Sequence, residues 1–524
     1  MSRTRRPGAD PTPVVIVGAG PVGLTAATLL GQYGVDCLVL DRWDGACPRP
    51  RAVHLDAEVY RVLARLGIGE QFAAVSRPTR GLQLIDRNHR VFAMFDLSGK
   101  HGVHGHPRAN MFDQPELEHM LRANLKDQST VSLRGNVEVT AVVQNSQGRV
   151  RVDFTDRLTG EHESVLASHV LGCDGANSVV RTAIGAQMED LKFEQRWLVV
   201  DLASRVDLDQ WEGVHQVCDP ERAATYMRIS ETRYRWEFRL LEDETATGFG
   251  SIEALRPLIG PWVEDIPNDQ LELVRVAEYT FRAQVADRWR DRSVFLLGDA
   301  AHLTPPFIGQ GLGAGIRDSM NLSWKIAGVL AGDLPQSTLD TYEVERKPHS
   351  RAMIQVAMLI GVFMTQGGKV GDLLRKAVAP RLHRVPGLRA RLLDSQTPPL
   401  LTSALVEGHG LRKSLNGRLC PNALLADGNR YDDVNPGGFV LLTGVPLSPE
   451  QRTDLVGRGI QVLEVEPGSP LHQWLAQGSA AAALVRPDFT VMDSGRDVGG
   501  LCAVAPRFLA AGQRPKAASP IGVT

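Results

Sequence analysis

The chain has 524 residues, which at roughly 150 residues per domain predicts about three domains. Its 58 basic and 60 acidic residues give a net charge of −2 at pH 7, so neither a basic surface for nucleic acid nor an acidic tail is indicated. Hydrophobic residues make up 43% of the chain and charged residues 23%, which is typical of a globular protein with large cores. This composition excludes a low-complexity chain.

The N-terminal segment superficially resembles a twin-arginine export signal, because Arg5 and Arg6 precede an uncharged run over residues 14–30. That run is short for a membrane span and is broken by turn-forming residues, so a strand–turn–helix fits it better. We expect residues 1–12 to be a disordered leader and the protein to have no membrane association. The six cysteines show no spacing typical of a metal site or redox pair, so we expect no metal and a reducing cytoplasm.

The predicted elements begin with a βαβ unit: a strand at 14–17, a helix at 22–33 and a strand at 35–40. A helix at 56–66, short strands over 80–112, a helix capped by Asp113 and antiparallel strands over 131–172 follow. Residues 190–285 are mostly β, with period-two alternation over 226–241. A buried strand at 293–297, helices at 312–330 and 338–364, and a small α/β unit over 400–524 complete the chain.

The first motif is Gly18-Ala19-Gly20-Pro21-Val22-Gly23, between the first strand and the first helix. Glycines there allow a tight turn and let a pyrophosphate approach the amides at a helix N-terminus. Asp41 stands 18 residues after Gly23, at the end of the second strand, where a carboxylate accepts hydrogen bonds from an adenosine ribose. A purely structural turn is the alternative. The motif predicts a dinucleotide but does not distinguish NAD from FAD.

Two further motifs follow buried strands. The first contains Asp174-Gly175, and the second contains Gly298-Asp299 and leads into the Pro305-Pro306-Phe307-Ile308-Gly309-Gln310-Gly311 run. A carboxylate beside glycines at a strand end can hold a ribityl or ribose hydroxyl, and a glycine run that opens a helix offers its amides to a phosphate or to the polar edge of a flavin. Each motif taken alone is also compatible with an ordinary strand-ending turn.

The three motifs in this order resemble the class A flavoprotein aromatic monooxygenases, which have the para-hydroxybenzoate hydroxylase fold. Pro305–Gly311 and the downstream Gly315-Ile316-Arg317-Asp318 are most similar to the 3-(3-hydroxyphenyl)propionate hydroxylase branch. The resemblance implies non-covalent FAD, with NADH or NADPH as co-substrate; the single fingerprint fits a nicotinamide that has no domain of its own. The implied FAD-binding residues are Gly18, Gly20, Gly23, Asp41, Arg42, Arg51, Gln114, Asp174, Gly298, Asp299, Gly309, Gly311 and Leu312.

The resemblance also implies the α/β architecture and its division into domains. We expect a discontinuous Rossmann-like FAD-binding domain (13–80, 108–190 and 285–395), interleaved with a mainly antiparallel β-sheet substrate domain (81–107 and 191–284). Residues 400–524 resemble the thioredoxin-like C-terminal extension of the phenol hydroxylase subgroup, here without a redox cysteine pair, so a structural role or a homodimer contact is expected.

The implied reaction is hydroxylation of a phenol ortho or para to its hydroxyl, by oxygen transferred from a flavin hydroperoxide. We assign the substrate-hydroxyl contact to the backbone of Pro305 and Pro306, which offers only carbonyl acceptors, and a proton-acceptor role to His54. His302 is expected to make a structural hydrogen bond. The expected substrate-binding residues are Tyr226, Arg228, Trp236 and Phe307, with an arginine of this sheet pairing a substrate carboxylate; a solvated sheet face is the alternative.

Two other functions stay open on the sequence. The same fold supports oxygenases that hydroxylate or perform Baeyer–Villiger oxidation on a polyketide or antibiotic, and fold alone does not separate these reactions. A non-catalytic FAD-binding module is the alternative from another class. NADH consumption that depends on a phenol would exclude that module.

Overall fold

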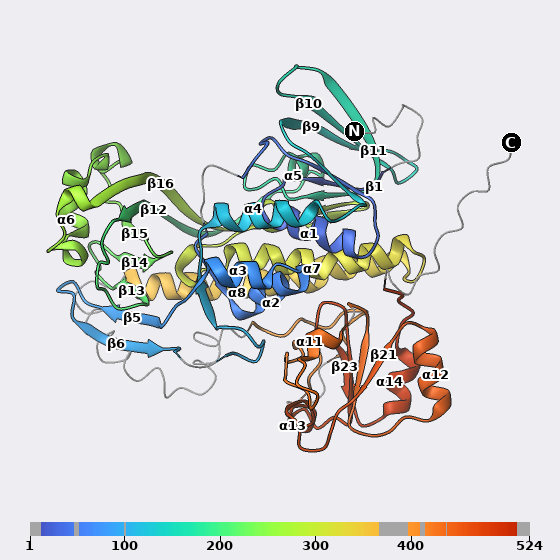
Figure 1. Cartoon of the computed structure of the whole chain (residues 1–524). Coiled ribbons are helices and arrows are strands. Elements are labelled where there is room, and N and C mark those ends of the chain that lie inside the picture. The colour runs from blue at the N-terminus through green and yellow to red at the C-terminus, as the bar shows by residue number, and fades with distance from the viewer. Residues whose placement is uncertain are drawn as a thin grey trace.

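The computed structural model describes residues 12–46, 52–98, 101–365, 397–408, 414–435 and 437–510. Figure 1 shows two sheet-containing regions joined by long central helices, with a separate small unit, coloured orange and red, beside α2 and α7. The expected leader falls almost wholly outside the described residues, and β1 already begins at Thr12.

The first sheet is built around the predicted βαβ unit, and its strand order is β17-β18-β11-β1-β2-β8. The pairs β1–β11, β1–β2, β2–β8 and β11–β18 are parallel, while β9 and β10 extend β11 as an antiparallel meander. Its strands are β1 (Thr12–Val17), β2 (Cys37–Leu40), β8 (Val131–Arg134), β9 (Val137–Gln144), β10 (Val150–Asp156), β11 (His162–Gly172), β17 (Arg290–Asp291) and β18 (Val294–Leu296). Continuous apolar runs such as 14–17 are buried because helices cover the parallel part of the sheet.

Five of the helices that pack with this sheet confirm predicted helical segments to within a few residues, and two short helices, over 69–75 and 179–183, are not predicted from the sequence. The helices are α1 (Pro21–Gln32), α2 (Ala57–Leu66), α3 (Gly69–Val75), α4 (Gln114–Leu125), α5 (Val179–Ala183), α7 (Gly311–Leu330) and α8 (Thr341–Thr365). Asp113 occupies the N-cap position of α4 as predicted, but its side chain makes no capping hydrogen bond. Three short strands, β3 (His54–Asp56), β7 (Ala109–Met111) and β4 (Arg77–Pro78), form a small sheet. In the chain, β3 leads into α2 and β7 precedes α4.

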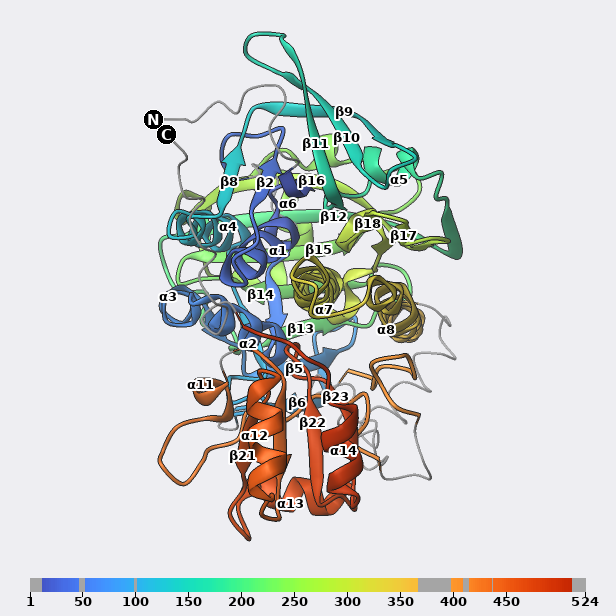
Figure 2. The same cartoon turned by 90° about the vertical axis from the view of Figure 1, so that its right-hand side faces the viewer.

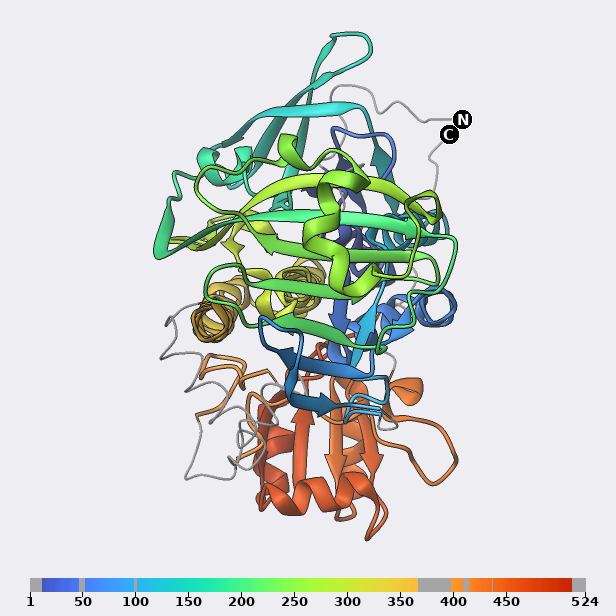
Figure 3. The ribbon, with the colours of Figure 1, turned by 90° about the vertical axis from the view of Figure 1, so that its left-hand side faces the viewer.

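The second sheet has the strand order β19-β16-β12-β15-β14-β13-β5-β6 and is antiparallel except for the β13–β5 pair. Its strands are β5 (Gly81–Ile85), β6 (Val91–Asp96), β12 (Met188–Ser204), β13 (Val214–Val217), β14 (Ala224–Arg228), β15 (Arg233–Arg239), β16 (Leu271–Ala286) and β19 (His302–Leu303). Figure 3 shows α6 (Ile252–Val263) lying across the face of this sheet that is turned away from α7 and α8.

The C-terminal unit contains a four-stranded sheet in the order β21-β20-β22-β23. Its elements are α11 (Tyr431–Val434), β20 (Val440–Thr443), α12 (Pro449–Gly457), β21 (Gln461–Glu464), α13 (Pro470–Gln477), β22 (Ala482–Val485), β23 (Val491–Gly495) and α14 (Val498–Val504). The separate α/β unit is therefore confirmed, while its thioredoxin-like character stays a prediction.

Figure 2 shows this unit below α2, α7 and α8. Buried charges attach it to these helices. The Arg61 guanidinium of α2 pairs with Asp432 and donates to the Cys420 carbonyl at 2.6 Å. On the other side, Arg486 donates to both Glu345 carboxylate oxygens of α8 at 2.9 Å, and Lys325 of α7 donates to Glu345 at 2.8 Å. The C-terminal unit thus contacts the helices that carry the predicted site.

Candidate functional site

The glycine fingerprint forms a turn between β1 and α1, and its three glycines have different roles. Gly18 has a φ of +103°, and a Cβ there would lie 2.3 Å from the Cys173 carbonyl oxygen. A Cβ on Gly23 would lie 2.0 Å from the Gly18 carbonyl oxygen, so both glycines are required by the packing of the chain itself. A Cβ on Gly20 would meet no heavy atom within 4 Å. The open space at the N-terminus of α1 fits a pyrophosphate group.

Asp41 lies beside this turn, as the predicted contact with ribose requires. One carboxylate oxygen accepts a hydrogen bond from the Ala19 amide, and the other accepts from the Trp43 amide at 2.7 Å. The neighbouring Arg42 side chain is exposed and pairs with Glu138 at 3.0 Å. Asp41 therefore stabilises the glycine turn itself, and its contact with a ribose stays a prediction, as does cofactor binding by Arg42.

Asp174 closes the turn that starts α5. Its carboxylate accepts from the Ser178 hydroxyl at 2.5 Å and from the Val180 amide at 3.1 Å, and burial raises its pKa. Gly175 has a φ of +81° and open space where a Cβ would be. The carboxylate fixes the geometry of this motif. Its expected effect on the nicotinamide cofactor stays a prediction.

The Gly-Asp motif is held by Asp318 of α7, for which we expected no contact with this motif. Gly298 has a φ of +59°, and its amide donates to Asp318 at 3.0 Å. His302 Nε2 and Arg346 Nε each lie 2.9 Å from the same carboxylate, and the three side chains are buried. The structural role predicted for His302 is confirmed. Asp299, half-buried, follows directly in this anchored turn.

A second buried network holds the N-terminus of α7, where Gly309, Gly311 and Leu312 lie. Asp56 caps α2 by accepting from the Val59 amide at 2.9 Å, and it also accepts from Gln310 at 2.8 Å and Arg317 at 2.6 Å. Arg317 pairs in addition with Glu58 at 2.9 Å. The only signal for these residues in the sequence is the charged pair at 317–318 inside an otherwise mainly apolar helix.

His54 lies against Gly309, two residues after Phe307 in the Pro305–Gly311 run. A Cβ on Gly309, whose φ is +61°, would lie 2.5 Å from His54 Nδ1. Burial lowers the pKa of His54, although Asp56 opposes the shift, so the imidazole is neutral near pH 7 and able to accept a proton. The Pro306 carbonyl already accepts from the Gly309 amide at 2.8 Å. Pro305 is therefore the better acceptor of the two prolines for an incoming hydroxyl.

The resemblance also implies FAD contacts for Arg51 and Gln114. Arg51 lies outside the described residues. Gln114, the first residue of α4, accepts from the Ala52 amide at 2.8 Å and donates to Glu118 at 2.8 Å. Gln114 thus positions the chain that leads into His54, and its contact with FAD stays a prediction.

The second sheet has an outer face that packs on α6 and an inner face that is turned toward the FAD-binding region. On the outer face, Tyr226 stacks with Trp262 of α6 at a centroid distance of 5.7 Å, and Trp236 is buried in the same cluster. On the inner face, Trp197 contacts the Phe307 ring at 5.8 Å. The expected substrate contacts of Tyr226 and Trp236 are therefore corrected, because both side chains point away from His54 and Pro305.

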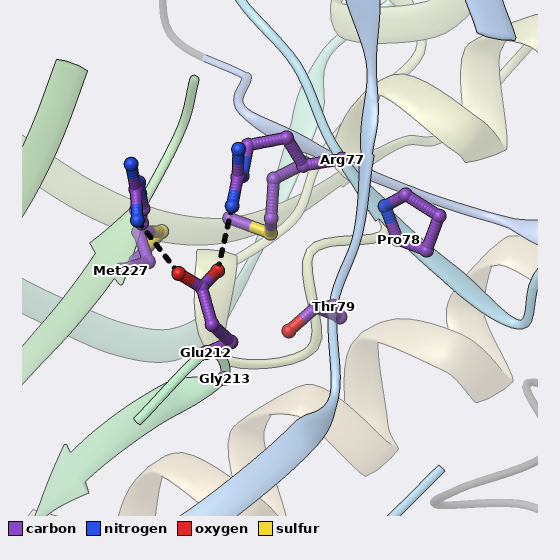
Figure 4. Close-up of a pocket in the computed structure, with 8 residues that line it drawn as sticks. Arg77, Pro78, Thr79, Glu212, Gly213 and Met227 are labelled. Atoms are coloured by element: carbon purple, nitrogen blue, oxygen red, sulfur yellow. Dashed lines mark hydrogen bonds and ion pairs between the residues drawn. The ribbon is translucent and has the colours of Figure 1, made fainter. Parts of the chain in front are cut away.

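Arg228 lies on the same side of β14 as Tyr226, and its charge is already paired. Figure 4 shows the carboxylate of Glu212 between Arg77 and a second guanidinium, that of Arg228, with ion-pair distances of 2.9 and 2.7 Å. Arg228 also pairs with Asp207 at 2.8 Å. The pocket in this view holds about 10 Å³, room for a water molecule only. The expected pairing of Arg228 with a substrate carboxylate is therefore corrected as well.

Phe307 links the inner face of the sheet to α8. Its ring lies 5.7 Å from the Phe193 ring, and a Cβ on Gly361 would lie 2.5 Å from it. This position between β12, α8 and the Pro305–Pro306 segment is compatible with the predicted substrate contact, which stays a prediction.

Comparison with known proteins agrees with this geometry. Residues 11–357 match the model of the FAD binding domain family. The chain belongs to this family. FAD is accordingly its cofactor, and the open space at Gly20, the anchored Gly298-Asp299 turn and the glycine-rich start of α7 are the parts of this chain that fit it.

The chain is similar to curated hydroxylases over nearly the whole length of both proteins. A probable NADH-specific resorcinol 4-hydroxylase of Rhodococcus jostii is 32% identical over 95% of this chain and 94% of its own. A 3-(3-hydroxy-phenyl)propionate/3-hydroxycinnamic acid hydroxylase of Burkholderia vietnamiensis is 33% identical, with coverages of 95% and 93%.

Two solved structures give the same result for the fold. The flavin-dependent monooxygenase PieE, in complex with FAD and substrate, has a TM-score of 0.76 at 25% identity and covers 94% of this chain and 98% of its own. Aklavinone-11 hydroxylase with FAD and aklavinone reaches 0.78 at 22% identity, with coverages of 95% and 98%. Within the described residues, no helix is long and apolar enough to cross a membrane.

Proposed function

We propose that this protein is an FAD-dependent monooxygenase that hydroxylates a phenol ortho or para to its hydroxyl, with NADH or NADPH and O₂ as co-substrates. The observation that carries the proposal is that one FAD-binding framework combines the open glycine turn, the anchored Gly298-Asp299 turn and the close approach of His54 to Gly309, at the end of the segment that begins with Pro305. The full-length similarity to proteins named as phenolic hydroxylases supports the reaction class. NADH is preferred because one of these relatives is named NADH-specific.

Bound FAD supplies the activation of O₂ and the transfer of one oxygen atom to the ring. The protein's own residues bind the cofactor and orient it. The amides at the start of α1 receive the pyrophosphate, while Asp318 and Asp56 fix the two turns that face the rest of the cofactor. Because these two carboxylates are buried and fully engaged, the turns are set before any ligand binds.

The Pro305 carbonyl and His54 act on the substrate in this proposal. The carbonyl accepts the hydrogen bond of the bound phenol hydroxyl, which raises the electron density of the ring. When the ring reacts, this hydroxyl proton leaves the carbonyl and passes to neutral His54. Burial keeps His54 unprotonated over the neutral range, which suits an acceptor.

The test measures product formed per NADH consumed over a panel of phenols, with flavin reduction followed separately. We expect phenol-stimulated NADH oxidation and a hydroxylated product. A tightly bound flavin whose reduction by NADH and NADPH no phenol or polyketide alters would instead favour a non-catalytic binding module. Product formation from a polyketide alone would favour the polyketide oxygenase.

The His54 assignment has its own test. The His54→Ala variant is expected to bind FAD but to lose coupling of NADH oxidation to product formation, with the acidic limb of the coupling–pH profile removed. Unchanged coupling and an unchanged profile would show that the backbone or water activates the hydroxyl.

The proposal also includes two properties expected from the sequence, a homodimer and a cytoplasmic location. Sedimentation analysis of the FAD-bound protein and fractionation of cells that express the full chain test them directly. A monomer at micromolar concentration would refute the homodimer and leave the proposed reaction class unaffected.

A further inference from the structure

The inner face of the second sheet carries a carboxylate that no part of the proposed mechanism uses, that of Glu237 on β15. Its neighbours Trp236 and Phe238 are both buried in the outer cluster on α6. Because successive side chains of a strand point to opposite faces, Glu237 lies on the inner face. It pairs with Val199 of β12 on one side and with Thr225 of β14 on the other.

On this face, side chains that lie next to each other across the strands form rows, and Val199, Glu237 and Thr225 form one of them. The rows on either side of it both contact the FAD-binding region. In one row, Trp197 packs against Phe307, directly after Pro305-Pro306. In the other row, Met227 clusters with Val53, directly before His54. Glu237 lies between these two contacts. It is thus opposite the two segments to which the proposed mechanism assigns the substrate hydroxyl.

The ion pairs next to Glu237 are made by another carboxylate of the same face, Asp201. Arg235 donates to both oxygens of Asp201, at 2.6 and 2.9 Å, and Arg275 of β16 lies 3.1 Å from the same carboxylate. Among the described residues, none donates a hydrogen bond to the half-buried Glu237 carboxylate. Burial and the charge of Asp201 raise the pKa of Glu237, while the charges of Arg235 and Arg275 act to lower it.

We propose that Glu237 is a substrate-binding residue, whose carboxylate accepts a hydrogen bond from a ring hydroxyl of the phenol on the sheet side of the site. This inference rests on the proposed function and deepens it. It assigns the substrate to phenols with two hydroxyl groups, one directed to the Pro305 carbonyl and one to Glu237. A carboxylate-bearing phenol fits less well here, since Asp201 and Glu237 together balance the charges of Arg235 and Arg275, and a further carboxylate would face the like charge of Glu237.

The experiment compares the binding of resorcinol with that of 3-methoxyphenol, in which a methyl group replaces one hydroxyl hydrogen of resorcinol. Binding is measured by the change that each compound causes in the flavin spectrum. For wild type, we expect resorcinol to bind on the order of tenfold more tightly, the effect of one hydrogen bond to a charged group. Glu237→Gln and Glu237→Asp should reduce that preference to about twofold while retaining FAD. The matched control Glu272→Gln, at an exposed site on β16 of the same sheet, should keep the wild-type preference.

The outcomes separate this inference from the function on which it rests. If no phenol stimulates NADH oxidation by wild type, the proposed function is refuted. If phenols do so but both Glu237 variants retain the wild-type preference for resorcinol, the role of Glu237 is refuted alone. Tighter binding of 3-(3-hydroxyphenyl)propionate than of resorcinol by wild type would overturn the assignment of the substrate class.

Discussion

Replacing Asp318 by asparagine tests whether one buried carboxylate stabilises the Gly298-Asp299 turn. The substitution keeps the shape of the side chain but removes the charge that Arg346 pairs with at 2.9 Å, and both side chains are fully or almost fully buried. Removing one partner of a buried ion pair costs about 3–5 kcal/mol, because the remaining charge has no counter-ion. That cost is a large part of a typical unfolding free energy of about 5–15 kcal/mol.

Urea unfolding of the FAD-bound protein, followed by tryptophan fluorescence, measures this cost. The matched control is Asp340→Asn, which breaks the pair with Arg290 at a carboxylate that is 71% exposed and should cost at most about 1 kcal/mol. The Asp318→Asn variant should also lose flavin, since the Gly298 amide loses its charged acceptor. If the two variants are equally stable and both retain flavin, the reasoning is refuted.

The pH dependence of the same variant has a defined sign. Burial opposes ionisation of Asp318, but Arg346 and His302 outweigh it and hold the pKa of the carboxyl below its ordinary value of 3.8. The carboxylate therefore contributes stability above that ordinary pKa and loses its contribution as the pH falls through the lower value in the folded state. The stability difference between wild type and Asp318→Asn should be constant near neutral pH and shrink only below about pH 4. A difference that changes mainly between pH 6 and 8 would contradict this assignment.

Three further predictions follow from the geometry. Gly20→Val should fold like wild type, since the added Cβ meets no atom within 4 Å, but purify without flavin; a fully yellow variant would contradict the pyrophosphate assignment. Asp174→Ala should slow reduction of the flavin by NADH in stopped-flow measurements, because the first turn of α5 loses its acceptor; an unchanged rate at full flavin content would refute it. Arg486→Met should destabilise the protein by about 3–5 kcal/mol and expose the C-terminal unit to limited proteolysis, because Glu345 loses its bidentate partner; wild-type resistance would refute this.

The sequence by itself determined the local parts of this protein. Period and turn residues located β1, α1 and α2, and the glycine fingerprint identified a dinucleotide site, because strand–turn–helix geometry is set by residues close in the chain. Gly23 shows why, because a Cβ there would lie 2.0 Å from the Gly18 carbonyl oxygen of the same turn, whereas Gly18 is required by Cys173, which is distant in the chain.

Only the tertiary structure decided which face of the second sheet meets the cofactor. Period-two alternation over 226–241 shows that β15 has an aromatic face and a charged face, but it does not show which of the two meets the cofactor. The packing of α6 on Tyr226 and Trp236, from residues far along the chain, leaves Glu237 on the inner face. The anchoring roles of Asp318 and Asp56 were equally inaccessible, since a buried charge is explained only by distant partners.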